Sequence, residues 1–377
     1  MYRKSYLMIS FRIPILRVAL IACRTIASSL LLFHVFSSVC HGLVETCEEL
    51  QAAFDLTKTQ NVVIQVHPFV HIDCVDFTTM SMDSNTLTVE SSENIDNFHG
   101  NSNLNQIRFE VTNGAKLFWE TNVILYGSDR HDVDGGGLFI GEGSTIRFKN
   151  NVEMVDFGVR SVPEEGSDYA SYFRSGGCVY TDGYFRVDGE ATFTNCDVRG
   201  GPGGGLFVGG KGSVLFNGGL DMSDISIFGE FGTNGGGIYN EGKVNVKGDA
   251  KFENLAARSG GAIYNAVGAQ FRFKNGANAD FLHCTMVDGT AGALHNEGYL
   301  KFSGPAIFVD TETPAIFISS DGNTVLSGNS VFRDTYVDSH AAILVAAGGE
   351  LVIPNSVIFL DSETECSRVN YLEDDDC

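Results

Sequence analysis

Short segments in which apolar and polar residues alternate recur along most of the chain. Each begins at a glycine and has the two-residue period of a half-buried β-strand. The segments are GAKLFW, GSTIRF, GYFRV, GSVLF, GKVNV, GAQFRF, GYLKF, GNTVL and GELVI, which start at Gly114, Gly143, Gly183, Gly212, Gly242, Gly268, Gly298, Gly322 and Gly349. Their spacings are 29, 40, 29, 30, 26, 30, 24 and 27 residues, so the chain contains nine copies of one repeating unit.

Each unit contains two further apolar segments. One follows a pair of small residues, as in GGLFI at Gly136 and GGAIYN at Gly260, and the other resembles FTN at Phe193 or FEN at Phe252. Three short strands in roughly 24 to 30 residues fit one coil of a parallel β-helix, whereas a propeller blade needs four strands and about 40 to 45 residues. We therefore predict an all-β, single-stranded, right-handed parallel β-helix solenoid of about 9 to 11 coils, in which the paired glycines occupy a corner at positive φ.

These repeats also predict the domain boundaries. Residues 105–362 form the regular coils, residues 43–104 form the N-terminal cap and the first coils, and residues 363–377 form an acidic C-terminal tail. The segment TCEELQAAFDLT, Thr46–Thr57, is expected to be a short amphipathic helix. It would cover the N-terminal edge, because an open parallel edge invites aggregation.

Residues 1–42 are expected to be a secretory signal peptide. They contain five basic residues, no acidic residue, and an apolar run that ends in small residues. An uncleaved membrane anchor and a mitochondrial transit peptide are the alternatives. We expect the protein to be secreted or at the cell surface, and to contact a membrane only if this segment stays uncleaved.

The net charge indicates which binding partners to expect, and the cysteine content bears on the cellular compartment. Beyond residue 42 the chain has 20 Lys and Arg residues against 47 Asp and Glu residues, so it repels phosphate backbones and we expect no nucleic-acid partner. Seven cysteines remain in that part, and none has zinc-ligand spacing. In an oxidising compartment Cys47 is able to pair with Cys74 and Cys366 with Cys377, and the odd number leaves at least one thiol free.

The repeats resemble those of a known family. SGGAIYN, Ser259–Asn265, and FKNN, Phe148–Asn151, resemble the two phrases of the right-handed β-helix passenger domains of polymorphic outer-membrane proteins, and FTNC and FENL are similar to the second phrase. The resemblance covers residues 105–362, and comparable coils occur in pectin-lyase-like proteins. It implies an extracellular, adhesin-like or surface-layer role.

Two sets of acidic residues are candidate calcium ligands. In DRHDVDGGG the carboxylates of Asp129, Asp132 and Asp134 lie close together, and a solvated loop before the glycine corner is the alternative. A second set holds one residue in each successive coil. Its members are Asn195, Asp224, Asn254, His283, Asp310, Asp334 and Asp361. The last three predict weak Ca²⁺ binding, and the alternative is that Asn and Asp suit a turn at this position.

The 40-residue spacing contains an insertion, Gly158–Ser175, which is a candidate wall of a binding site. Its residues Tyr169, Tyr172, Phe173 and Arg174 are suited to stacking on a sugar ring, and a tolerated loop is the alternative. No catalytic residue is assigned, because no Arg or Lys ladder beside an acidic ladder is recognisable in the sequence.

The function expected from these features is an adhesive or binding scaffold for extracellular polysaccharide or surface proteins. A Ca²⁺-dependent carbohydrate-active enzyme, of the polysaccharide lyase or epimerase type and acting on acidic glycans, is one alternative. A structural component of a cell wall or matrix is another.

Overall fold

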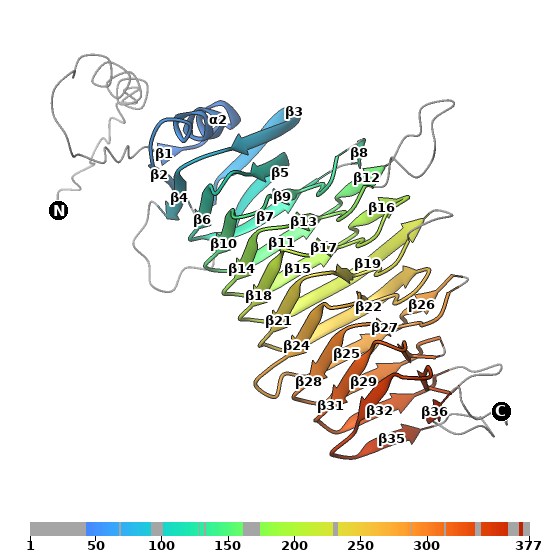
Figure 1. Cartoon of the computed structure of the whole chain (residues 1–377). Coiled ribbons are helices and arrows are strands. Elements are labelled where there is room, and N and C mark those ends of the chain that lie inside the picture. The colour runs from blue at the N-terminus through green and yellow to red at the C-terminus, as the bar shows by residue number, and fades with distance from the viewer. Residues whose placement is uncertain are drawn as a thin grey trace, which may run out of the picture.

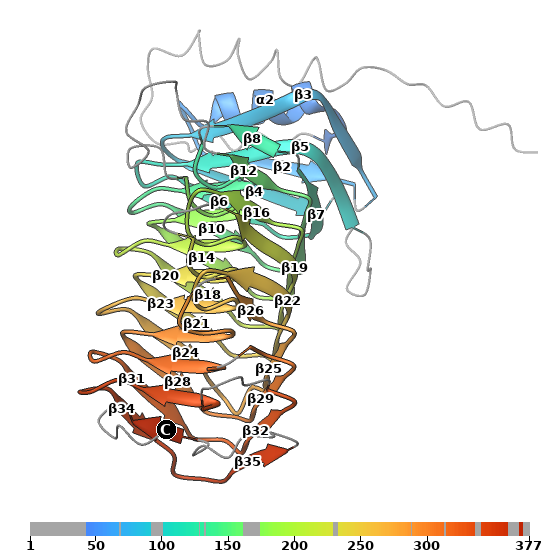
Figure 2. The same cartoon turned by 90° about the vertical axis from the view of Figure 1, so that its right-hand side faces the viewer.

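The chain is a parallel β-solenoid. The computed structural model describes residues 43–67, 69–91, 101–127, 129–131, 133–160, 174–228, 233–287, 289–312, 314–335, 341–360 and 369–371. These residues form an all-β solenoid of about nine coils with one α-helix at the N-terminal end (Figures 1 and 2), so the predicted fold class is confirmed. The predicted signal segment lies outside the described residues, and no described helix is long and apolar enough to cross a membrane.

Nine regular coils each contribute one strand to a twelve-stranded parallel sheet, here named sheet A, and residues 43–104 contribute the other three. In sheet order its strands are β1 (Leu43–Val44), β2 (Val62–Val66), β4 (Thr86–Ser91), β6 (Lys116–Trp119), β10 (Thr145–Phe148), β14 (Tyr184–Val187), β18 (Ser213–Phe216), β21 (Lys243–Val246), β24 (Gln270–Phe273), β28 (Tyr299–Phe302), β31 (Asn323–Leu326) and β34 (Glu350–Val352). The strands from β6 to β34 are the nine segments predicted from the glycine spacing. In β10, Ile146 and Phe148 are buried while Thr145 and Arg147 face outward, as a period of two requires.

The other 24 strands form one connected sheet, in which we distinguish three parallel ladders. Ladder B consists of β7 (Asn122–Tyr126), β11 (Val152–Val155), β15 (Ala191–Thr194), β19 (Leu220–Phe228), β22 (Ala250–Ala257), β25 (Ala279–Leu282), β29 (Ala306–Val309), β32 (Ser330–Arg333) and β35 (Val357–Leu360). Ladder C consists of β9 (Leu138–Ile140), β13 (Val179–Thr181), β17 (Leu206–Val208), β20 (Ile238–Asn240), β23 (Ile263–Asn265), β27 (Leu294–Asn296), β30 (Ile316–Ile318), β33 (Ile343–Val345) and β36 (Val369–Tyr371).

The third ladder was not predicted. It contains β8 (Asp129–His131), β12 (Gly158–Arg160), β16 (Asp197–Arg199) and β26 (Thr285–Met286), and the ends of β19 and β22 continue it. Several coils therefore have a fourth short strand between ladders B and C. At the N-terminal end the long strands β3 (His71–Met82) and β5 (Asn101–Val111) run through both ladders, since β5 pairs with β7 and with β9.

Like residues stack on like residues inside the coils. One interior column of ladder B consists of Phe252, Phe281, Phe308, Phe332 and Phe359, whose consecutive ring centroids are 5.0, 4.8, 4.6 and 5.1 Å apart. Such stacking follows from the parallel in-register pairing, and burying each ring contributes about 2 to 3 kcal/mol. Trp119 is fully buried in the same interior, where its indole N–H donates to Thr121 Oγ1 at 2.7 Å.

A helical cap covers the N-terminal edge, as the sequence predicts. Helix α2 (Cys47–Leu56) begins after Thr46, whose side-chain oxygen accepts a hydrogen bond from the Glu49 N–H at 3.2 Å. The helix buries Leu50, Ala53 and Phe54, and the Phe54 ring stacks on Phe109 at 5.3 Å. The first coil is thereby closed by an apolar helix face rather than left as an open edge.

Two disulfides are present in the described residues. The Cys47–Cys74 bond confirms one expected pair and ties α2 to β3, whereas Cys178–Cys196 was not predicted. The expected partners Cys366 and Cys377 lie outside the described residues. Cys284 is a buried free thiol whose pKa is raised by burial to about 12, so it is not a reactive nucleophile.

The first two glycines of each corner are required for different reasons. Each corner has a run of two or three glycines, and the first glycine of the run has a φ between 63° and 73°, so positive φ occurs at the predicted corner. These residues are Gly135, Gly176, Gly203, Gly235 and Gly260. The second glycine is required because consecutive coils approach closely. A Cβ on Gly236 would lie 2.2 Å from the carbonyl oxygen of Gly261, and one on Gly204 would lie 2.4 Å from that of Gly236. This column of second glycines is named the glycine ladder.

A buried row of amide side chains joins four coils, and we name it the amide ladder. The Asn240 side-chain N–H donates to Asn265 Oδ1 at 2.7 Å, and the Asn265 side-chain N–H donates to Asn296 Oδ1 at 2.7 Å. Asn296 in turn donates to Thr324 Oγ1 at 2.9 Å. All four side chains are fully buried, so these hydrogen bonds satisfy polar groups that water does not reach.

Candidate binding surface

The outer face of sheet A concentrates the positive charge of an acidic protein. Of the 20 Lys and Arg residues beyond residue 42, nine lie on the outward positions of sheet A or directly after its strands. They are Lys116, Arg147, Lys149, Arg186, Lys243, Lys247, Arg272, Lys274 and Lys301. In the register of the sheet Arg147 lies beside Arg186, and Arg272 lies beside Lys301. These positions are 29 to 39 residues apart in the chain, so the sequence did not reveal them as a ladder.

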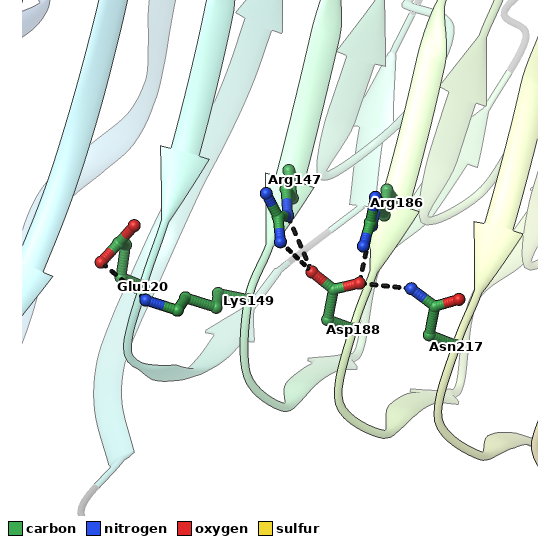
Figure 3. Close-up of polar contacts among 6 residues, drawn as sticks. All are labelled: Glu120, Arg147, Lys149, Arg186, Asp188 and Asn217. Atoms are coloured by element: carbon green, nitrogen blue, oxygen red, sulfur yellow. Dashed lines mark hydrogen bonds and ion pairs between the residues drawn. The ribbon is translucent and has the colours of Figure 1, made fainter. Parts of the chain in front are cut away.

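In the N-terminal half of this face Arg147, Lys149 and Arg186 are paired with carboxylates (Figure 3), whereas Lys116 forms no ion pair within the described residues. Asp188 accepts hydrogen bonds from Arg147 Nε at 2.7 Å and from Arg186 Nε at 2.6 Å, and a third from the Asn217 amide. Burial alone would raise the pKa of Asp188, but these three hydrogen bonds outweigh it and lower the pKa below its usual value. In the preceding turn, Lys149 Nζ lies 3.2 Å from Glu120 Oε2.

We expect Asp188→Asn to lower the free energy of unfolding by about 1 to 2 kcal/mol at pH 7, because two arginines lose a charged acceptor. A carboxyl whose pKa is lowered by folding stabilises the fold above its unfolded pKa, and this stabilisation is lost as the pH falls through the folded pKa. The difference in urea midpoint between wild type and variant should therefore shrink as the pH is lowered below about 4. A difference that stays constant from pH 7 to pH 3 would contradict this assignment.

In the C-terminal half five cations lack such partners, and we name them the cationic patch. They are Lys243, Lys247, Arg272, Lys274 and Lys301. They lie on or just after the adjacent strands β21, β24 and β28, and none forms an ion pair with a carboxylate of the described residues. The Arg272 guanidinium lies over the Tyr299 ring at 5.2 Å from its centroid, and its Nε has no hydrogen-bond partner.

Uncharged side chains separate the cations of the patch on the outer face of the sheet, while Glu241, Asp249 and Glu297 lie in the adjoining turns. On the two neighbouring strands, β18 and β31, and between the cations, the outward or following residues carry no charge. They are Ser213, Leu215, Asn217, Asn245, Gln270, Tyr299, Ser303, Asn323, Val325 and Ser327. All five cations are exposed or partly exposed. Because strands are about 4.8 Å apart, the three strands present this charge over roughly 10 Å along the solenoid axis.

The predicted cluster before the first glycine corner is only partly described. Asp134 accepts a hydrogen bond from the Ser175 N–H at 2.8 Å, and one of its oxygens lies 3.7 Å from Arg174 Nη1. Burial raises the pKa of Asp134. Asp129 lies in β8, where only its backbone is described, and Asp132 lies outside the described residues. The proposed joint role of these three carboxylates in metal binding stays a prediction.

The predicted row of one residue per coil occupies a bend between ladder B and the short ladder. Asp310 and Asp334 have φ values of 48° and 50°, in the left-handed region that Asn and Asp adopt more readily than most residues. Asp310 Oδ2 lies 3.5 Å from His283 Nδ1, while Asp361 lies outside the described residues. No group of three or more His, Cys, Asp or Glu side chains suited to a metal ion occurs in the described part of the chain.

Four residues of the insertion were predicted to stack on a sugar ring. Tyr169, Tyr172 and Phe173 lie outside the described residues. Arg174 is described, and its contact with Asp134 directs it toward the glycine corner. This part of the predicted site stays a prediction.

Sequence reasoning also missed an outward row of rings on ladder C. The row consists of Phe139, Tyr180, Phe207, Tyr239, Tyr264, His295 and Phe317, with neighbouring centroids 4.4 to 5.3 Å apart. Because neighbouring rings pack against one another, the row presents mainly ring edges, which do not serve as a stacking platform for sugars. The signal was present in the recurring aromatic residue of GGLFI, GGCVY and GGIYN.

Comparison of the chain with protein-family models, with curated proteins and with solved structures finds no match. The class of the protein is therefore defined by its geometry, as a disulfide-bonded parallel β-solenoid with a cationic patch on one face.

Proposed function

We propose that the protein is a secreted or cell-surface binding scaffold whose cationic patch binds acidic extracellular polysaccharide. The observation that carries this proposal is the set of five cations without carboxylate partners on three adjacent strands, in a chain that is otherwise strongly acidic. Unpaired cations on a flat, rigid sheet attract a polymer with regularly spaced carboxylates or sulfates, because no internal ion pair has to be broken first.

Two further observations support this proposal. The disulfides Cys47–Cys74 and Cys178–Cys196 favour an oxidising, extracellular compartment, in agreement with the expected signal peptide. The Tyr299 ring beside Arg272 and Lys301 adds an aromatic surface of the kind that contacts sugars. The resemblance to surface adhesins points to the same role, and it rests on the repeat phrases alone.

An acidic polysaccharide fits this surface better than nucleic acid does. The patch is local, and the overall excess of acidic residues repels a polymer of high charge density. A polyuronate carries at most one charge per sugar, so local attraction by the patch is opposed less strongly by the rest of the protein. Neither a calcium-dependent enzyme nor a purely structural component is favoured by a specific contact among the described residues.

The test is binding of the secreted chain to polygalacturonate, measured by calorimetry at low and physiological salt. A variant with Lys243, Arg272, Lys274 and Lys301 replaced by glutamine should bind at least about thirtyfold more weakly. This factor corresponds to the loss of four exposed contacts that each contribute about 0.5 kcal/mol to binding. Salt should weaken binding of the wild type more than that of the variant.

The matched control changes the same net charge elsewhere, with Lys58, Lys211, Lys251 and Arg333 replaced by glutamine. These residues are exposed or partly exposed and lie outside the cationic patch. The proposal is wrong if the control weakens binding as much as the patch variant, if polygalacturonate and alginate do not bind at all, or if DNA binds more tightly than either. Absence of saturable binding would favour a structural component.

A further inference from the structure

A polar pocket of about 290 Å³ lies at the N-terminal ends of β23 and β27, on the side of ladder C away from sheet A. Its lining residues are Asn234, Arg258, Ser259, Tyr264, Gly289, Thr290 and His295. The β20 and β23 labels in Figure 2 mark the neighbouring coils. The pocket shares no residue with the cationic patch.

A chain of hydrogen bonds runs from the mouth of the pocket to a carboxylate. Thr290 is exposed, and its hydroxyl lies 2.6 Å from His295 Nδ1. On the other side of the ring, His295 Nε2 lies 3.3 Å from Glu297 Oε1. Ser259 Oγ accepts the Thr290 backbone N–H at 3.0 Å and lies 2.9 Å from the Thr290 hydroxyl, which fixes the position of Thr290.

The arrangement assigns the proton positions. An ionised carboxylate only accepts hydrogen bonds, so the proton of the neutral imidazole is on Nε2 and points to Glu297. Nδ1 is then unprotonated and accepts from the Thr290 hydroxyl. The ring is only 7% exposed and stacks on Tyr264 at 4.4 Å. Burial lowers the pKa of His295, and the Glu297 charge partly opposes that effect, so the ring is neutral at neutral pH.

We propose that Thr290, His295 and Glu297 form a nucleophile, base and carboxylate relay that hydrolyses short-chain carboxylic esters. Thr290 is the exposed residue that a substrate reaches and its hydroxyl is the nucleophile, the buried imidazole is its base, and Glu297 is a positioning residue. Arg258 is exposed in the same pocket and supplies a cation for the negative charge that develops on the carbonyl oxygen. The small volume favours a short acyl group.

The reaction balances with water as the only co-reactant. Thr290 Oγ1 attacks the carbonyl carbon while His295 Nδ1 accepts its proton; the bond to the alcohol oxygen then breaks, and His295 returns the proton to the departing alkoxide. Water next attacks the acyl–Thr290 ester with the same nitrogen as base. The carboxylic acid leaves and Thr290 regains its proton, so one ester and one water become one alcohol and one acid.

The test treats the intact, disulfide-bonded chain with a fluorophosphonate probe, locates the adduct by mass spectrometry, and measures 4-nitrophenyl acetate hydrolysis in parallel. We expect the adduct on Thr290 of the wild type and none there in Thr290→Val. His295→Gln should lower kcat/KM at least about 100-fold, the usual contribution of a general base. The control His283→Gln replaces an exposed histidine in a neighbouring bend and should leave both readouts unchanged.

The role of Glu297 has its own readout. Its charge raises the pKa of His295, so Glu297→Gln should move the midpoint of the kcat/KM profile to lower pH. Arg258 and the Tyr264 hydroxyl are the other charged or titratable groups that line the pocket. If the hydrogen bonds only stabilise the corner, the wild type should form no adduct on Thr290. Alternatively, a folded His295→Gln variant should hydrolyse the ester as fast as the wild type. Either result overturns the proposal. Thr290→Val, at an exposed position, keeps the test decisive if His295→Gln does not fold.

Discussion

Replacing Gly236 with alanine is expected to lower the free energy of unfolding by roughly 3 kcal/mol or more. The added Cβ would lie 2.2 Å from the Gly261 carbonyl oxygen and 2.9 Å from that of Ala256, and both belong to backbone that is already hydrogen-bonded. Relief requires two coils to move apart, which breaks the parallel ladder at that point. Urea unfolding followed by far-UV circular dichroism measures the effect.

Gly219→Ala is the matched control for this change. Gly219 also has no positive φ, but its added Cβ would meet nothing closer than 3.4 Å, the distance to the Asp249 carbonyl oxygen. Alanine there should be neutral or stabilise by up to about 1 kcal/mol, because it restricts the unfolded chain. If both variants unfold at the wild-type urea concentration, the close approach of the coils at the glycine ladder is wrong.

Replacing Asn265 with alanine should have a similarly large effect, about 3 kcal/mol. Asn265 is the middle member of the amide ladder, so its removal deprives Asn240 of an acceptor and Asn296 of a donor. Asn240 Nδ2 keeps its hydrogen bond to the Gln270 carbonyl and Asn296 Oδ1 keeps the one from the Gly298 N–H, so each of these atoms loses one of two partners. Each hydrogen bond lost in the dry interior costs about 1 to 3 kcal/mol. The same urea titration measures the loss, and the effect on stability should be independent of pH between 5 and 9, since no member of this ladder titrates there.

Asn245→Ala is the control for the amide ladder. Asn245 is also on a central strand, but it faces outward on β21 and is only partly buried, so water replaces its hydrogen bonds. Its loss should change stability by less than about 0.5 kcal/mol. Equal destabilisation by Asn245→Ala and Asn265→Ala would show that the buried hydrogen bonds do not account for the effect.

The fold was predictable because its signal repeats. Nine glycine-led segments with a period of two define the strands of sheet A, and parallel stacking follows from their spacing. The short ladder was missed because two- and three-residue strands such as β26 and β8 are too brief to show a period. The glycine ladder was explained only in part, since the sequence indicates a tight turn but not the distance to the next coil.

The sites were harder to predict than the fold. The amide ladder was accessible in principle, because Asn240 and Asn265 follow an outward tyrosine and alternation places them inside. The cationic patch depends on register, which brings together Arg272 and Lys301 from different repeats. The contact between Thr290 and His295 depends on the path of a loop, and no residue pattern encodes it.

The glycine ladder and the parallel pairing allow the solenoid to be lengthened by whole repeats. In the described residues, the strands of sheet A pair only with those of the coil before and the coil after, so a duplicated unit is accommodated without redesign of a shared centre. A chain with one additional copy of residues 242–267 would be longer by a single rung of about 4.8 Å and would carry a second pair of lysines equivalent to Lys243 and Lys247. Duplication of a repeat in the gene would thus lengthen the charged face and increase its number of cations, while the type of side chain at each position stays the same.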